Sequence, residues 1–341
     1  MYPQHPQLPG QQPQEKHARL HTFWGKGFSK ALKSKVCIIG CGSLGSSTAL
    51  AMAKIGIPKL TLVDRDFVEP ENLATQQYTE PQIGLPKAIA LSIEAKKASP
   101  YIEVHEMVED FNTENAEQII SSHDLVIDGT DNFETRLIIN ETCVKLAIPY
   151  VFGSVIKNQG MAALFDDKIC MQCVFRNPPR RPETCDISGV SSEAVSTAAS
   201  LQVSEAMKCL TGGKKSGQLL SFNLSINDFT VSKMKQNPQC RVCKQRQFSR
   251  LEDKQKRATV LCGRNSVQIL PEKAVDVKAL EEKIKKTDSG SGIELLNSNM
   301  FLLRFRKKPY TFNLFNNGRC IIQGTNDESK AKSLYSRYIG N

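Results

Sequence analysis

The 341-residue sequence has no apolar run close to the roughly 18–20 residues that span a bilayer, so we expect no membrane-spanning segment and no membrane partner. Glycine and proline, at 21 and 16 residues, are not in excess, which excludes a collagen-like or low-complexity chain. The sequence contains no G-x-x-x-x-G-K-[ST] motif, which excludes a P-loop nucleotide site. Its length exceeds the roughly 250–300 residues at which one core usually stops growing, so at least two domains are expected.

Acidic residues are outnumbered 35 to 45 by basic ones, and the formal net charge is +10. Residues 1–245 hold 26 basic and 25 acidic residues, whereas residues 246–341 hold 19 and 10, so nearly all of the excess lies in the tail. Such a tail favours an acidic protein or a nucleic acid as partner. The 11 cysteines are an odd number without a secretory signal before them, which favours a reducing, cytoplasmic location over a disulfide scaffold.

Strand-like and helix-like patterns alternate through the first half of the chain. Strands are expected at residues 35–39, 59–63, 125–128 and 150–155, and helices at residues 44–55, 87–98 and 132–146. This alternation predicts an α/β fold with a Rossmann-like, doubly wound, mostly parallel sheet. Later strands at 160–165 and 219–223 are expected to flank a helix at about 191–210.

Composition divides the chain into four parts. Residues 1–14 contain four prolines and five glutamines and are expected to form a disordered arm rather than a targeting signal. Residues 15–245 carry the alternating pattern, residues 246–257 are polar as in a linker, and residues 258–341 form a small basic α+β domain. Within the last part, Asn317-Gly318 predicts a hairpin because both residues tolerate positive φ, and a helix is expected at 328–339.

A glycine-rich loop lies between the first predicted strand and helix, with the sequence Gly40-Cys41-Gly42-Ser43-Leu44-Gly45. The spacing G-x-G-x-x-G lets the backbone approach a phosphate and points a helix N-terminus at it. Asp64 ends the next strand, where an acidic side chain can bind a ribose hydroxyl. The alternative is a simple tight turn. The motif is typical of NAD sites, but no substrate domain with a hydride-transfer residue is evident.

Two C-x-x-C pairs occur, and their members are Cys170, Cys173, Cys240 and Cys243. Four thiolates at this spacing suit a closed, tetrahedral, structural zinc site. The alternatives are a thioredoxin-type redox pair and buried free cysteines. Zinc is favoured because the pair is duplicated and neither pair opens a helix after a strand. Such a metal stabilises the fold and is not the catalyst, since four thiolates leave no open position.

Besides the glycine loop and the two cysteine pairs, several further motifs occur in a fixed order: Asp64-Arg65-Asp66, Asn72-Leu73, Lys87, Thr130-Asp131-Asn132 and Thr184-Cys185-Asp186. With these motifs, residues 30–245 resemble the ThiF/MoeB/HesA family, the prokaryotic relatives of ubiquitin-activating enzymes. The tail, from Leu261-Cys262-Gly263-Arg264-Asn265 to Tyr338-Ile339-Gly340, is similar to the appended domain of thiamine-type ThiF adenylyltransferases of Gram-positive bacteria.

The resemblance implies an adenylyltransferase that uses ATP, Mg²⁺ and Zn²⁺ and forms a homodimer. Its protein substrate would be a small ubiquitin-fold sulfur carrier ending in Gly-Gly, whose terminal carboxylate attacks the α-phosphate of ATP. The acyl-adenylate would lead to a carrier thiocarboxylate, with sulfur from a donor such as a cysteine desulfurase. The tail favours thiazole (thiamine) biosynthesis, and a molybdopterin-synthase carrier is the alternative.

The resemblance also assigns roles to individual residues. Asp131 would hold Mg²⁺ beside the phosphates, with Asn132 assisting; the alternative for Asp131 is an N-cap of the next helix. Lys87 would contact phosphate as a point charge, or else be a solvated lysine at a helix start. The remaining ATP contacts implied are Gly42, Asp64 and Asn72.

Cys185 lies in a segment rich in proline and arginine, and the nearby charges of Arg180 and Arg181 favour its thiolate. In the family this position can carry a thioester or acyl disulfide, so the resemblance implies a sulfur-transfer role. The cysteines in apolar strand or helix contexts are expected to be core residues. These are Cys37, Cys41, Cys143 and Cys209.

The sequence departs from the family pattern at Thr75, where the family has a phosphate-binding arginine. Losing one charge-assisted contact costs about 1.5–3 kcal/mol, which weakens catalysis without abolishing it. Arg136 or Lys87 is a candidate substitute, and Arg19 is the nearest match to a second family arginine near the N-terminus. A degenerate, non-catalytic carrier-binding relative is therefore a second hypothesis.

A third hypothesis is a zinc-containing nucleic-acid binder, because aromatic and basic residues interleave in the tail. The aromatic residues are Phe301, Phe305, Tyr310, Phe312 and Phe315, and the basic ones are Arg304, Arg306, Lys307 and Lys308. The same alternation is typical of a hairpin with one buried face, which we favour. Nucleic acid is therefore not the expected partner, and the basic surface could instead steer an acidic carrier protein.

Overall fold

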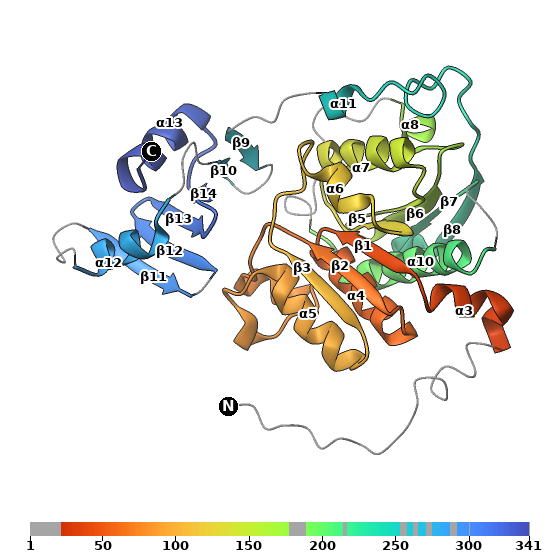
Figure 1. Ribbon diagram of the computed structural model, residues 1–341, viewed down its shortest axis with the longest axis horizontal. Coiled ribbons are helices and arrows are strands. Elements are labelled where there is room, and N and C mark those ends of the chain that lie inside the picture. The colour runs from red at the N-terminus through yellow and green to blue at the C-terminus, as the bar shows by residue number, and fades with distance from the viewer. Residues whose placement is uncertain are drawn as a thin grey trace, which may run out of the picture.

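The computed structural model describes residues 22–176, 189–213, 217–252, 258–261, 265–270, 275–286, 292–299 and 301–340. It contains an eight-stranded and a six-stranded sheet, which lie side by side in Figure 1. The larger sheet runs in the order β3 (Glu103–Met107), β2 (Lys59–Val63), β1 (Lys35–Ile39), β4 (Leu125–Asp128), β5 (Tyr150–Ile156), β6 (Gln159–Phe165), β7 (Gln218–Asn223) and β8 (Asp228–Lys233). The strands from β3 to β5 pair in parallel, and those from β5 to β8 pair antiparallel.

Helices cover both faces of this sheet, which explains why the central strands β1 and β4 are buried at every position except Lys35 and are mostly apolar. One face packs against α3 (Phe28–Ala31), α4 (Ser43–Ile55), α5 (Lys87–Ala98) and α10 (Ser192–Leu210). The other face packs against α6 (Ala116–Ile120), α7 (Phe133–Leu146) and α8 (Met171–Val174). The predicted α/β fold with a mostly parallel sheet is confirmed.

The smaller sheet is antiparallel throughout its pairings, in the order β11 (Ile293–Ser298), β12 (Leu302–Lys307), β13 (Tyr310–Phe315), β14 (Cys320–Gln323), β10 (Ser266–Ile269) and β9 (Ala258–Leu261). Its core packs against α12 (Val277–Lys286) and α13 (Glu328–Tyr338). The hairpin predicted at Asn317-Gly318 joins β13 to β14, with Gly318 at a φ of +82°.

Three aromatic residues of the tail are buried, two in the core on one face of this sheet and one in a cluster on the other. The rings of Phe305 and Phe312 are fully buried and stack 4.7 Å apart. Phe315 is also buried, and it faces the larger sheet's loops. These three rings are therefore engaged in packing and are not available to stack on bases. The hairpin is confirmed, but both of its faces carry buried rings rather than the one face expected.

The first part of the segment that connects the two sheets lies against α7. The Arg246 guanidinium donates to the carbonyl oxygen of Val144 at 2.8 Å, and Glu141 accepts the backbone N–H of Arg250 at 2.9 Å, just inside α11 (Ser249–Glu252). The predicted arm at residues 1–14 and residues 253–257 of the predicted linker lie outside the described residues. In the part of the chain that is described, none of the helices combines the length and apolarity needed to cross a membrane.

Candidate nucleotide and metal sites

The glycine-rich loop lies where the strand order of the larger sheet reverses, between the carboxyl ends of β1 and β4. Gly40 follows β1 at a φ of +88°, and Gly129 follows β4. A Cβ on Gly45 would lie 1.9 Å from the carbonyl oxygen of Gly40, and a Cβ on Gly129 would lie 2.3 Å from the same oxygen. Three glycines therefore let α4 and two loops close on one another at the crevice where doubly wound sheets bind ligands.

Gly42 differs from its neighbours because a Cβ there would meet no atom within 4 Å among the described residues. It is the N-cap residue of α4, and no side chain caps that helix. The first-turn N–H groups and the helix dipole therefore face open space, which is an arrangement that binds anions. The geometry fits a phosphate at Gly42, as predicted from the motif.

Asp64 is held against this loop. One carboxylate oxygen accepts the N–H of Cys41 at 2.6 Å, and the other accepts the N–H of Asp66 at 2.7 Å. Burial raises the pKa of Asp64 and the charge of Asp66 raises it further, while the Lys87 ammonium and the two N–H donors oppose the shift. Each oxygen keeps a second lone pair with which to accept a ribose hydroxyl. Burial also raises the pKa of the Cys41 thiol well above its usual range, so this cysteine is a neutral core residue.

Lys87 is the first residue of α5 and is only 3% exposed, so the alternative of a solvated lysine is wrong. Among the described residues its ammonium forms no ion pair or hydrogen bond. Its charge acts on Asp64 and Cys41, which places it near the nucleotide loop. The stem of Lys87 is thus buried while its ammonium has no partner among the described residues, and a bound phosphate would supply one.

Asp131 is exposed in the loop after β4. The alternative in which it caps α7 is wrong, because the N-cap is Asn132, whose side-chain oxygen accepts the N–H of Thr135 at 2.9 Å. The Asn132 amide nitrogen lies 3.5 Å from an Asp131 oxygen. Asp131 therefore keeps a solvent-facing carboxylate, a ligand type that Mg²⁺ prefers, while Asn132 holds the loop.

Thr75 lies against the first residue of α4. Its hydroxyl is 2.9 Å from that of Ser43, and the N–H of Gln77 donates to Ser46 at 3.2 Å. Asn72 lies in the preceding turn, η2 (Pro70–Ala74), where its oxygen accepts the N–H of Glu69 at 2.9 Å. The segment that carries these residues thus crosses the first turn of the helix at which a phosphate would bind.

Arg136 is not available as a substitute for the missing arginine, because it is buried in the core. Its Nε donates to the Asp128 carboxylate at 3.1 Å, and its Nη2 donates to the carbonyl oxygens of Thr130 and Gly153. The Tyr150 hydroxyl donates to the same carboxylate at 2.8 Å. This buried network, which sequence reasoning missed, holds the loop that carries Asp131. Arg19 lies outside the described residues.

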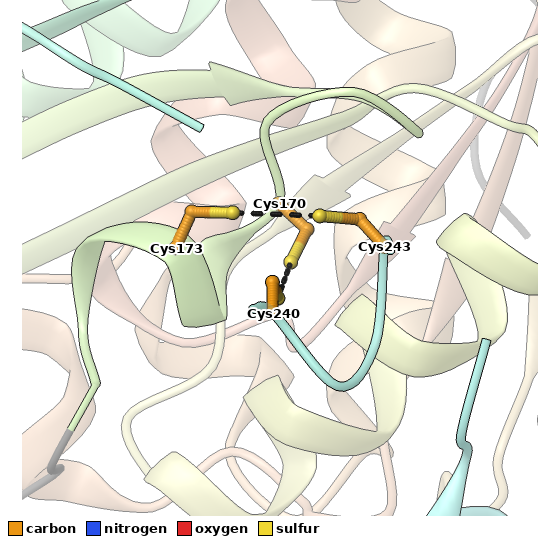
Figure 2. A group of neighbouring side chains, drawn as sticks. All are labelled: Cys170, Cys173, Cys240 and Cys243. Carbon is orange, nitrogen blue, oxygen red and sulfur yellow. Dashed lines mark hydrogen bonds between the residues drawn. The ribbon is translucent and has the colours of Figure 1, made fainter. Parts of the chain in front are cut away.

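The two C-x-x-C pairs are 70 residues apart in the sequence. In the structure they come together, as Figure 2 shows. The Sγ atoms of Cys170 and Cys240 are 3.6 Å apart, those of Cys173 and Cys243 are 3.4 Å apart, and all four lie within 4.8 Å of one another. Zn–S bonds of about 2.3 Å in a tetrahedron require S–S distances of about 3.8 Å. Four buried sulfur donors at this spacing fit zinc.

The surroundings of the four cysteines also suit a closed metal site. Val144, Val242 and Phe248 pack around the sulfurs and exclude water. The backbone N–H of Asn237 donates to the Cys173 sulfur at 3.4 Å, which favours a thiolate there. The 3.6 Å and 3.4 Å contacts each join one pair to the other, an arrangement that a redox C-x-x-C pair does not require. Cys185 lies outside the described residues.

Comparison with known proteins identifies a family and several similar proteins. The model of the ThiF family matches residues 15–242. A Bacillus subtilis relative, "Sulfur carrier protein ThiS adenylyltransferase", is 34% identical over 92% of this chain and 95% of its own length. An Escherichia coli relative, "Molybdopterin-synthase adenylyltransferase", is 32% identical over 63% of this chain and 90% of its own length. The crystal structure of E. coli MccB with ATP shares the fold, with a TM-score of 0.60 at 19% identity over 69% of this chain and 76% of that one.

Proposed function

The chain belongs to the ThiF family, and we propose that it adenylates the C-terminal glycine of a small ubiquitin-fold sulfur carrier protein at the expense of ATP. The observation that carries this proposal is the uncapped start of α4 at Gly42, open among the described residues, near the buried Lys87 side chain, whose ammonium has no partner in the same part of the chain. Together they provide hydrogen-bond donors and a positive charge where the triphosphate of ATP would bind.

In the proposed reaction, a terminal carboxylate oxygen of the carrier attacks the α-phosphorus of ATP. The bond between that phosphorus and the oxygen bridging to the β-phosphate breaks, and pyrophosphate leaves with the electron pair. Asp64 binds the ribose, while Gly42 and Lys87 hold the phosphates. No strong base is needed because the nucleophile is already ionised, so catalysis depends on positioning and on neutralising charge.

Asp131 would hold Mg²⁺, assisted by the loop that Asn132 caps, and Asn72 would complete the nucleotide contacts. When bound, Mg²⁺ neutralises charge on the phosphates. Zn²⁺ would be held by Cys170, Cys173, Cys240 and Cys243 and stabilise the fold. These assignments place the adenylyltransferase activity in residues 15–245, with residues 258–341 as a small appended domain.

The proposed pathway is thiazole (thiamine) biosynthesis. The support is the extent of similarity: the B. subtilis ThiS adenylyltransferase matches 92% of the chain, whereas the E. coli molybdopterin-synthase enzyme matches 63%. The first match therefore includes most of the chain beyond residue 245. A molybdopterin-synthase carrier is the alternative substrate.

The carrier acyl-adenylate would lead to a thiocarboxylate. A persulfide, supplied by a donor such as a cysteine desulfurase, would attack the acyl carbon and expel AMP; a thiol would then cleave the S–S bond, releasing the thiocarboxylate and forming a disulfide. Cys185 is the proposed sulfur-handling thiol. The enzyme is proposed to act as a cytoplasmic homodimer.

A Cys185→Ala variant should keep ATP–pyrophosphate exchange and form less thiocarboxylate, and loss of exchange would contradict this division of roles.

ATP–pyrophosphate exchange with purified carriers tests the proposal. We expect exchange that requires a Gly-Gly-ended carrier and is faster with a thiazole carrier than with a molybdopterin carrier. The reverse preference would favour the alternative substrate. Carrier binding without exchange would favour the degenerate, carrier-binding hypothesis, for which the absence of an arginine at Thr75 is the motivating observation.

A further inference from the structure

The smaller sheet contacts the larger one only a few residues from the proposed nucleotide site. Its β14 begins beside Arg319, which is 1% exposed although it is a charged residue. The Arg319 guanidinium lies 3.7 Å from the centre of the Phe315 ring and donates to the backbone carbonyl oxygen of Arg65. It also donates to the Gln268 side chain at 3.2 Å. A buried guanidinium from the appended sheet thus holds the peptide bond between Arg65 and Asp66, one residue beyond Asp64.

A second layer of contacts fixes this arrangement. The amide of Gln268 donates to Asp110 at 2.9 Å, and Asp110 pairs with the Arg65 guanidinium at 2.8 Å. The position of Arg319 is therefore determined by groups from both sheets. Burial lowers the pKa of Arg319 to about 10, which leaves it charged near neutral pH, and nearby aspartates favour that charge.

Other residues in or next to the appended sheet contact the Glu69 side chain and the Gly84 backbone. Gln323 donates to the Glu69 carboxylate at 3.2 Å, and Arg304 lies 3.9 Å from the same carboxylate. Glu69 and Asn72 cap their turn reciprocally, so these contacts reach a second proposed ATP residue. Asn299 donates to the carbonyl oxygen of Gly84 at 3.0 Å.

The two backbone segments held in this way are bonded to each other. Val68 accepts the N–H of Gly84 and donates its own N–H to Leu85, both at 2.8 Å. The N–H of Lys87 donates to the carbonyl oxygen of Asp66 at 2.9 Å. The segments 65–69 and 84–87 therefore form one unit, which starts next to Asp64 and ends at Lys87.

We propose that Arg319 is a positioning residue for the nucleotide site: the appended sheet uses it to hold the unit that presents Asp64 and Lys87 to ATP. This inference rests on the proposed function, because it assigns ATP to that site. It gives the appended sheet a role in nucleotide affinity, exerted through that unit.

The test uses the full-length chain with three substitutions. Arg319→Met removes both hydrogen bonds, and Gln323→Ala removes a half-exposed contact with less risk to folding. Arg337→Met is the matched control. Arg337 is an exposed arginine on α13, the helix that packs against the same sheet, and its guanidinium also lies over an aromatic ring, 5.4 Å from the centre of Tyr338. For each variant we would measure MgATP affinity by calorimetry without carrier, and kcat and KM for ATP in carrier-dependent exchange.

Arg319→Met should raise the Kd and KM for ATP about tenfold and lower kcat less, and Gln323→Ala should raise both about threefold, since each loses hydrogen bonds that position the site. Arg337→Met should match the wild type. A purely structural role would lower the active fraction, and hence kcat, with KM unchanged; that result overturns the proposal. If Arg319→Met does not fold, an unchanged KM in Gln323→Ala overturns it. Failure of the wild type itself to bind MgATP would overturn the proposed function as well, which distinguishes the two.

Discussion

Two glycines of the nucleotide loop, three residues apart, should respond to the same substitution in opposite ways. Gly45→Ala places a methyl carbon 1.9 Å from the Gly40 carbonyl oxygen and 3.3 Å from the Cα of Gly129. Both obstacles are backbone, so a loop must move by more than an ångström. Overpacking costs about 1–3 kcal/mol even where side chains can yield, so we expect a loss of about 3 kcal/mol or more in the free energy of unfolding.

The methyl group of Gly42→Ala meets no atom of the described residues within 4 Å, and the φ of −71° at this position is one that alanine adopts. Alanine is a poorer N-cap than glycine but has less conformational freedom in the unfolded chain, and these effects offset each other to within about 1 kcal/mol. The methyl group would occupy the space of the phosphate. Losing one charge-assisted hydrogen bond costs about 1.5–3 kcal/mol, which corresponds to about a 10- to 100-fold weaker affinity for ATP.

The assay is urea denaturation of both variants together with calorimetry of MgATP binding. The account predicts a stable Gly42→Ala protein with weak ATP binding and a destabilised Gly45→Ala protein. If Gly42→Ala binds ATP as the wild type does, the nucleotide does not bind at the start of α4. If Gly45→Ala is as stable as the wild type, the close packing of the three glycines is refuted.

Three further predictions follow from the same structure. Arg136→Met leaves the fully buried Asp128 carboxylate without its cation, so urea denaturation should show a loss of about 3–5 kcal/mol, and a loss below about 1 kcal/mol would contradict the network. Asp131→Asn, at an exposed position, should keep the fold while slowing Mg²⁺-dependent exchange by about 100-fold or more, and an unchanged rate would remove Asp131 from the metal role. Purified protein should contain one zinc per chain by elemental analysis; chelation or Cys243→Ser should lower the melting temperature, and a protein that contains no zinc when purified with its cysteines reduced would contradict the assignment.

The sequence predicted the central strands well because their signal is local. β1 and β2 begin and end where expected, since each is a short apolar run bounded by polar or glycine residues. β3 was missed because only Val104 is buried in it, and β8 was missed because it is an exposed edge strand. Edge strands bury little apolar surface, so their pattern resembles that of a loop.

Some parts of the candidate sites could be predicted from the sequence and others could not. The spacing of the four cysteines predicted that they would meet, and the structure brings them within 4.8 Å. The roles of Lys87 and Asn132 could not be decided from sequence, because burial and cap geometry depend on tertiary packing. The contact of Arg319 with Arg65 spans 254 positions and ends on a backbone oxygen, for which the sequence carries no signal.

Carrier-dependent ATP–pyrophosphate exchange tests the central claim most directly, because it reports the adenylation step alone and needs no sulfur donor. With MgATP and a thiazole carrier ending in Gly-Gly, the account predicts exchange that disappears when the terminal glycine of the carrier is removed. The claim would be contradicted by a folded, zinc-containing protein that binds MgATP and the intact carrier but exchanges no pyrophosphate.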